Sequence, residues 1–139
     1  MTSIFEVIEE NLLENIRSTN PTMIMIPHET SSKEDLFKYY FDQTGAKYMG
    51  RTWDSLDEVL IDTDWMKNDV VYIAHRLLPK LSNSDLTVYL KILRSAVEAH
   101  RKGPLKNISQ PQRKIDFHVT FIYSNREEKE MLETNLDQL

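Results

Sequence analysis

Three short apolar runs, separated by segments with helical spacing, constrain the fold of this chain more than any other feature. They are TMIMI (22–26), DVVYIAH (69–75) and DFHVTFIY (116–123). Runs of this length with apolar residues at successive positions are typical of buried strands. Strands that alternate with helices predict a parallel sheet with right-handed crossovers. The sequence therefore predicts an α/β fold with a small, parallel, three-stranded sheet flanked by helices.

The segments around these runs carry helix signals. Residues 31–45 begin with serines, have acidic residues in the expected first turn and end at a glycine, whereas residues 84–102 have an apolar stripe and end in basic residues before Gly103. Apolar residues at three- and four-residue steps predict an amphipathic N-terminal helix over residues 2–18. The C-terminal tail, residues 125–139, is polar and is expected to form a short helix or to fray.

The length of 139 residues is that of one domain, so we expect a single domain over residues 1–139. Its core is expected at about residues 22–124, with the N-terminal helix and the C-terminal tail as additions. The chain has no cysteine, which excludes disulfides and thiolate metal sites. The N-terminus lacks the basic start of a signal peptide, and no apolar run reaches membrane-spanning length. We therefore expect a cytoplasmic protein with no membrane partner.

The charge of the chain is unevenly distributed. The net charge is −5, and residues 52–69 hold six acidic residues against one lysine, whereas residues 101–114 hold five basic residues and no acidic one. A general nucleic-acid binder needs a basic surface, so direct nucleic-acid binding is not expected of the whole protein. The acidic excess favours a basic partner.

No motif in the sequence predicts catalysis. With only three glycines, neither a phosphate-binding loop nor a dinucleotide-binding turn can be formed. The His28-Glu29 pair lacks the second histidine of a zinc-protease motif, because position 32 is serine. The four histidines are scattered. We therefore expect a protein that is not an enzyme and needs neither a metal nor another cofactor.

The segment 52–61 is expected to form a short helix with an acidic side, for which Thr52 is a suitable N-cap. Helical spacing places Asp54, Asp57 and Glu58 opposite an apolar side. The helix dipole favours an acid at Asp54, in the first turn, but it does not compensate the charges further along. Two interpretations remain open: a solvated acidic face, or a face that binds the basic groove of a partner.

The stretch YMGRTWDSLDEVL (48–60) resembles the signature of the barstar family of intracellular ribonuclease inhibitors, approximately Tyr-x-Gly-Arg-Asn-Trp-Asp-Ala-Leu-x-Asp-x-Leu. In this sequence Thr52 replaces the usual asparagine, Ser55 the usual alanine and Glu58 the usual second aspartate. The positions that match outright are Tyr48, Gly50, Arg51, Trp53, Asp54, Leu56 and Leu60. The order of strands and helices extends the resemblance over residues 22–124.

The resemblance implies a barstar-like fold and an immunity protein that binds a basic ribonuclease toxin as a monomer in a 1:1 complex. Its acidic helix would occlude the RNA-binding active site of the toxin. At the position of a further acidic contact on the long helix, this chain has Ser95, beside Arg94. Two alternatives remain: a non-inhibitory interaction module of the same fold, and RNA binding through the basic loop 101–114. The partner-binding residues that the resemblance implies are Tyr48, Gly50, Arg51, Thr52, Asp54, Asp57 and Glu58.

Overall fold

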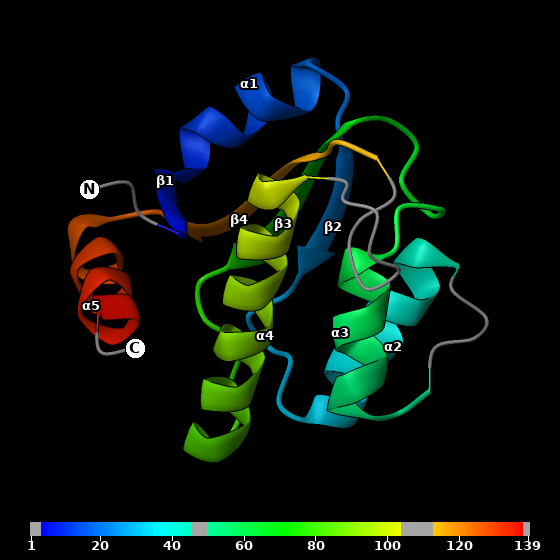
Figure 1. Cartoon of the computed structure of the whole chain (residues 1–139). Coiled ribbons are helices and arrows are strands. Elements are labelled where there is room, and N and C mark those ends of the chain that lie inside the picture. Colours follow the sequence, from blue (N-terminus) through cyan, green and yellow to red (C-terminus); the bar gives the residue numbers. More distant parts are fainter. Residues whose placement is uncertain (1–3, 46–49, 104–112, 138–139) are drawn as a thin grey trace.

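The structure, a computed structural model, describes residues 4–45, 50–103 and 113–137 (Figure 1). The three apolar runs form the three predicted strands, each within one residue of its expected bounds, and the C-terminal tail forms a helix. In chain order the elements are β1 (Glu6–Glu9), the 3-10 helix η1 (Glu10–Leu12), α1 (Leu13–Ser18), β2 (Thr22–Ile26), α2 (Lys33–Thr44), α3 (Trp53–Ile61), β3 (Val70–Arg76), α4 (Asn83–Lys102), β4 (Asp116–Tyr123) and α5 (Arg126–Asp137).

The sheet is parallel, as predicted, but it has four strands where the sequence predicts three. The strand order is β1-β4-β3-β2, so β4 and β3 are the central strands and β1 and β2 are the edge strands. The additional strand, β1, pairs with the end of β4 from Glu6 opposite Thr120 to Glu9 opposite Tyr123.

The predicted N-terminal helix over residues 2–18 is wrong, because the chain there forms β1, η1 and the short helix α1. A tertiary partner overrides the helical spacing: Phe5 is buried and its ring meets that of Phe121 edge-on, with centroids 5.6 Å apart. The Glu6 carboxylate also accepts a hydrogen bond from His118 of β4, at 2.9 Å. Because β4 offers an unpaired edge, the β-branched residues Val7 and Ile8 extend along it as a strand.

Side chains and glycines set the ends of the helices. The Ser32 hydroxyl accepts a hydrogen bond from Asp35 N and begins α2, which ends at Gly45 in the left-handed conformation (φ 66°). In the same way the Ser82 hydroxyl accepts from Asp85 N at the start of α4, and Gly103 (φ 76°) follows its last residue. The serine start of α2 and both glycine ends are predicted from the sequence, whereas the Ser82 cap lies before the predicted start of the long helix at residue 84.

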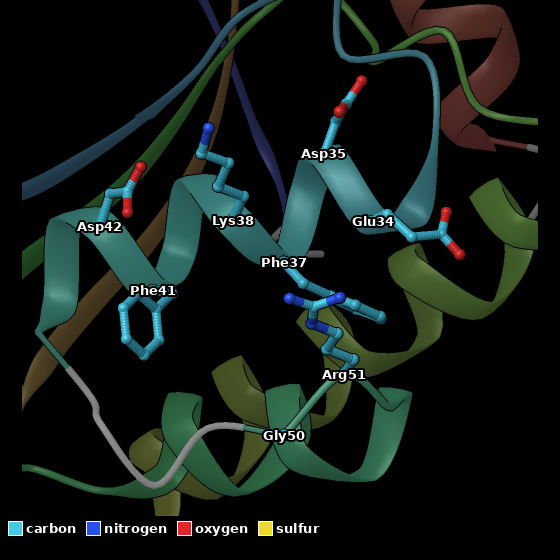
Figure 2. A pocket seen from close by; sticks show the side chains of 8 residues that line it. All are labelled: Glu34, Asp35, Phe37, Lys38, Phe41, Asp42, Gly50 and Arg51. Atoms are coloured by element: carbon cyan, nitrogen blue, oxygen red, sulfur yellow. The ribbon is translucent and has the colours of Figure 1, made fainter.

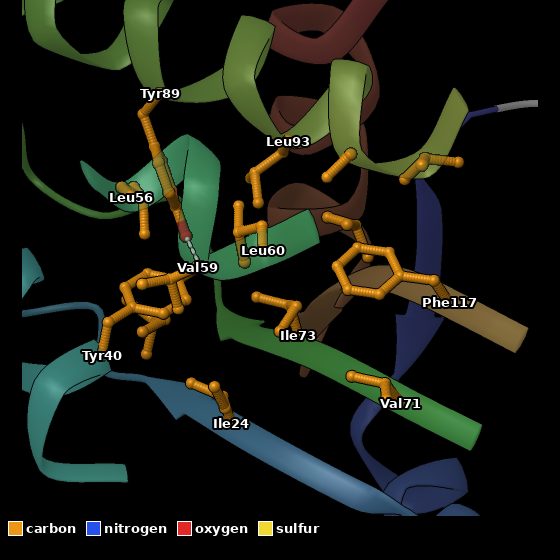
Figure 3. Packing of buried hydrophobic residues seen from close by; sticks show 14 of the residues in the cluster. Ile24, Tyr40, Leu56, Val59, Leu60, Val71, Ile73, Tyr89, Leu93 and Phe117 are labelled. Carbon is orange, nitrogen blue, oxygen red and sulfur yellow. Dashed lines mark hydrogen bonds between the residues drawn. The ribbon is translucent and has the colours of Figure 1, made fainter. Parts of the chain in front are cut away.

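The core lies between one face of the sheet and the helices α2, α3 and α4 (Figure 3). Every second residue of β2, β3 and β4 contributes to it, and the sheet side chains meet those of the three helices. The opposite face of the sheet carries partly exposed residues such as Met23, Met25 and Tyr72. The labelled members of the core in Figure 3 are Ile24, Tyr40, Leu56, Val59, Leu60, Val71, Ile73, Tyr89, Leu93 and Phe117.

A chain of hydrogen bonds runs through this core and joins α2 and α4 to the sheet. His75 Nδ1 donates to the Thr120 carbonyl at 3.0 Å, and its Nε2 accepts from the Tyr89 hydroxyl at 2.6 Å. The Tyr89 oxygen in turn accepts from the Tyr40 hydroxyl at 2.7 Å. All three side chains are fully buried, and burial lowers the pKa of His75 to about 4, so the imidazole is neutral.

The N-terminal and C-terminal additions are joined to each other at the carboxyl edge of the sheet. The Ser124 hydroxyl donates to Glu10 Oε2 at 2.6 Å, and Ser124 N donates to Glu128 Oε1 at 2.7 Å. Arg76, at the end of β3, donates to both Ser124 Oγ and Glu128. These bonds hold η1 and α5 against the strands, and Leu132 of α5 is buried in the core cluster.

Candidate partner-binding site

The segment that leads into α3 is built around one glycine and one cap. The Thr52 hydroxyl accepts a hydrogen bond from Ser55 N at 3.1 Å, which confirms Thr52 as the N-cap of α3, and it also lies 2.9 Å from Ser55 Oγ. A β-carbon at Gly50 would lie 2.8 Å from Ser55 Oγ. A larger residue at position 50 would therefore displace the hydroxyl that supports the cap.

The predicted division of α3 into an apolar and an acidic side is confirmed. Leu56, Val59 and Leu60 are completely buried against the sheet and α4. Trp53, in the first turn, packs edge-on against Phe37 of α2 with ring centroids 5.1 Å apart. The apolar side thus fixes the orientation of α3, and the acidic side is directed outward.

Three carboxylates share the outward side of α3. Asp54 and Glu58, one helical turn apart, are exposed, and Asp57 is half-buried between them. Among the residues that the structure describes, none forms an ion pair with any of the three. Burial and the neighbouring charges of Asp54 and Glu58 raise the pKa of Asp57. Within residues 4–45, 50–103 and 113–137, the negative charge of the site is therefore not paired with a cation.

Of the three remaining acidic residues of the segment 52–69, Asp62 and Asp69 have internal roles, and Asp64 is exposed. Asp69 Oδ1 accepts from Arg113 Nε at 3.1 Å, and Asp62 Oδ1 accepts from Asp64 N at 3.1 Å. Arg113 also donates to three carbonyls of the turn between α3 and β3, those of Thr63, Met66 and Asn68. This part of the charge is used to hold a turn together.

The other predicted site residues are placed as follows. Gly50, Arg51 and Thr52 are exposed beside the N-terminal end of α3, whereas Tyr48 lies outside the described residues. Ser95 is exposed on α4, and the neighbouring Arg94 pairs with Glu98 at 3.2 Å. Six of the seven predicted residues are therefore described, and they lie on α3 and on the segment that leads into it.

A groove adjoins this segment on the side of α2 (Figure 2). Its volume is about 610 Å³, and Gly50 and Arg51 form the wall opposite α2. The ring of Phe41, on α2, is 42% exposed and points into the groove. Glu34, Asp35 and Asp42 of α2 are also lining residues, although the carboxylates of Asp35 and Asp42 point away from the Phe41 ring in Figure 2.

The described residues offer no other obvious chemistry. Within residues 4–45, 50–103 and 113–137, no group of three or more histidine or carboxylate side chains could hold a metal ion. His75 is fully buried, and His118 is held between Glu6 and Asp116. None of the described helices is both long and apolar enough to cross a membrane.

Comparison with known protein families identifies the family to which this chain belongs. A family model described as "Barstar (barnase inhibitor)" matches residues 23–121, which is more than half of the chain. The chain belongs to the barstar family. No curated protein and no solved structure gave a match.

The barstar match runs from β2 to β4, so it includes α2, α3 and α4 and leaves out β1, α1 and α5. The acidic helix of this barstar-family protein thus lies inside the matched region, whereas the fourth strand and the C-terminal helix are outside it. The family is defined by an inhibitor of barnase, which makes a ribonuclease the kind of partner that the match supports.

Two features of this barstar-family protein are missed by sequence reasoning. Arg113 belongs to the basic loop 101–114, in which residues 104–112 lie outside the described residues, and it bonds to the turn after α3. The sequence shows that Arg113 is one of five basic residues in this loop, but it does not indicate which segment the side chain contacts. The groove beside Phe41 is also missed, because Phe41 belongs to a helix whose neighbouring aromatic residues, Phe37 and Tyr40, are core.

Proposed function

We propose that this barstar-family protein inhibits a basic ribonuclease by inserting the outward side of α3 into its RNA-binding groove. The observation that carries the proposal is the set of three carboxylates on α3, which have no ion-pair partner among the described residues. Their spacing and exposure suit the role of RNA phosphates. In the complex, Asp54 and Glu58 accept charge-assisted hydrogen bonds from arginine, lysine or histidine side chains of the enzyme.

The residues around these carboxylates have supporting roles in the proposal. Asp57 adds to the negative field, and Tyr48 supplies an aromatic contact of the kind that is enriched in interface hot spots. Gly50, Arg51 and Thr52 contact the rim of the enzyme's groove. The complex contains one inhibitor and one enzyme, and no chemical step takes place in it.

Electrostatics favours such a complex in two ways. Neighbouring acids on one helix repel each other, and a positively charged partner converts that repulsion into attraction. A long-range field between an acidic inhibitor and a basic enzyme also raises the rate of association. Rapid capture suits an immunity protein that protects the cytoplasm from a ribonuclease toxin, which is the setting we propose.

Affinity capture with matched variants tests the proposal. The wild-type chain and an Asp54→Asn/Glu58→Gln variant are used to isolate partners from the source cells, and each captured protein is assayed for RNase activity after release. A Glu127→Gln/Glu133→Gln variant serves as the control, because it removes the same charge from exposed positions on the distant helix α5. Each α3 substitution should weaken capture by at least about 2 kcal/mol.

The outcomes separate inhibition from its alternatives. Inhibition by α3 predicts that the wild type and the α5 control capture a basic protein whose RNase activity returns on release, and that the α3 variant does not. Equal capture by the α3 variant would refute the role of the acidic helix. A captured partner without RNase activity would favour the non-inhibitory interaction module.

A further inference from the structure

A histidine that lies between two carboxylates joins β1 to the rest of the sheet. His118, on β4, has its Nδ1 2.9 Å from Glu6 Oε1 of β1 and its Nε2 3.0 Å from Asp116 Oδ1 of its own strand. Its imidazole also stacks on the ring of Tyr72, on β3, with centroids 4.5 Å apart and 11° between the ring planes. Three neighbouring strands therefore meet at this one side chain.

Both ring nitrogens of His118 face a carboxylate oxygen, and this arrangement fits the charged form of the ring. A neutral imidazole has one N–H, so it can donate to only one of the two carboxylates. An imidazolium donates from both nitrogens, and charge-assisted hydrogen bonds are roughly twice as strong as neutral ones. The hydrogen bond to Glu6 is the main reason that the pKa of His118 is raised, and Asp116 adds to the effect, whereas burial opposes it.

Loss of the proton would change the charge balance between β1 and β4. A neutral ring leaves the carboxylates of Glu6 and Asp116 to repel each other across the junction of the two strands. The Tyr72 phenol stays uncharged as His118 titrates, because burial and these two carboxylates raise its pKa. Among the described residues, only Glu6 and Asp116 form an ion pair with His118. The other charged residues that line the adjoining groove are Asp69, Arg101 and Lys114.

β1 is a strand that can respond to this change without unfolding of the sheet. It lies at the edge of the sheet beside β4, with which it pairs through only four residues (Figure 1). It also lies outside the residues that match the barstar family model. The buried Phe5 ring and the hydrogen bond from Ser124 to Glu10 hold the two ends of the segment, and neither contact includes a histidine.

We propose that His118 is a pH-sensitive switch that holds β1 against β4 when it is protonated and loosens the strand when it loses the proton. Because the pKa of His118 is raised, the stabilisation is complete below about pH 6.5, the usual value, and is lost as the pH rises through the higher folded value. None of the residues involved belongs to the proposed contact surface on α3. The switch is therefore independent of the proposed function.

Hydrogen exchange of the full chain, labelled with ¹⁵N and followed by NMR, tests the switch from about pH 6 to about pH 9. Protection factors, which correct for the base catalysis of exchange, are compared between the amides of β1 and those of the central strand β3, so that global unfolding cancels. The ring signals of His118 give its titration midpoint in the same samples. Protection of β1 relative to β3 should fall about three- to tenfold across that midpoint, the range of one partly exposed charged contact.

Three variants assign the effect to its residues. Glu6→Gln should lower the titration midpoint of His118 and remove most of the pH dependence, because the carboxylate that is bridged to β4 is gone. Glu9→Gln removes the same charge from an exposed position on β1, and it should behave like the wild type. His118→Gln should remove the pH dependence of β1 protection altogether, and the protection of β3 reports whether this variant is folded.

Two results would overturn the switch. One is a relative protection of β1 that stays constant across the titration midpoint of His118 in the wild type. The other is a pH dependence in Glu6→Gln that equals that of the wild type, which would assign the opening to a different group. If His118→Gln does not fold, the comparison of Glu6→Gln with Glu9→Gln decides the question.

Discussion

Lowering the pH is expected to destabilise this protein through His75. The imidazole is fully buried, and burial keeps it neutral by lowering its pKa; in this state it donates to the Thr120 carbonyl and accepts from the Tyr89 hydroxyl. Protonation would turn Nε2 into a donor and force the Tyr89 hydroxyl to donate to Tyr40 instead. The Tyr40 hydroxyl would then lose its present acceptor in the core.

The size of the loss in the free energy of unfolding follows from the shift in the pKa of His75. Burial lowers the pKa of His75 from 6.5 to about 4, so at intermediate pH the unfolded chain binds a proton that the folded protein excludes. The stabilisation is therefore complete above the unfolded pKa and is lost as the pH falls toward the folded one. Between about pH 7 and pH 5 the loss is about 2 kcal/mol, and its limit at lower pH is about 3 kcal/mol.

Urea unfolding across this pH range measures the effect, with His75→Gln as the matched variant. Glutamine can donate to Thr120 and accept from Tyr89, but it does not titrate. Other groups also change protonation in this range: burial lowers the pKa of His100, and the Glu6 carboxylate raises that of His118. Their contributions cancel when the free energy of unfolding of the variant is subtracted from that of the wild type at each pH.

The difference between the two proteins should shrink by about 2 kcal/mol as the pH falls from about 7 to 5. A difference that stays constant to within about 0.5 kcal/mol would refute the reasoning, since this is the error expected when independent free energies are combined. It would mean that the buried imidazole is charged in the folded protein or that water reaches it.

Two further substitutions test the division of charge around α3. Glu58→Gln should raise the free energy of unfolding by about 0.2–0.5 kcal/mol, because it removes the repulsion with Asp54 one turn earlier; a lower free energy of unfolding, measured with urea, would show that Glu58 has a stabilising partner in the folded protein. Arg113→Met should lower the free energy of unfolding by about 1–2 kcal/mol, because three carbonyls of the turn after α3 lose their donor. Unchanged urea unfolding of that variant would show that solvent replaces the guanidinium at no cost.

The core of the fold can be predicted from the sequence because its signals are redundant. Each of β2, β3 and β4 is rich in apolar residues, and a serine or threonine cap precedes each of α2, α3 and α4. The N-terminal segment lacks such redundancy. Its apolar residues fit a helix as well as a strand, and only the free edge of β4 together with the burial of Phe5 selects the strand. That information is tertiary, so it is not contained in the local pattern.

The candidate site can also be predicted from the sequence only in part, because some of its features depend on tertiary packing. The acidic side of α3 follows from helical spacing alone, because its opposite side is strongly apolar. The groove beside Phe41 depends on how α2 and the segment around Arg51 lie relative to each other. Nothing in the sequence distinguishes Phe41 from Phe37, although one is exposed and the other is buried. Exposure of a single aromatic residue on a core helix is set by packing, and the sequence pattern does not determine it.

The structure also shows which acidic residues of the segment 52–69 are explained by contacts within the fold. Judged by sequence alone, all six acidic residues of the segment 52–69 need an explanation. Asp69 is paired with Arg113, and Asp62 closes a local turn, so those two charges serve the fold, whereas Asp64 is exposed beyond the end of α3. The three carboxylates on α3 form no ion pair with any described residue, and they stand on a helix whose other side is buried in the core. A helix held by its buried side that presents several carboxylates on the other is preorganised for a basic partner, because little backbone freedom remains to be lost on binding.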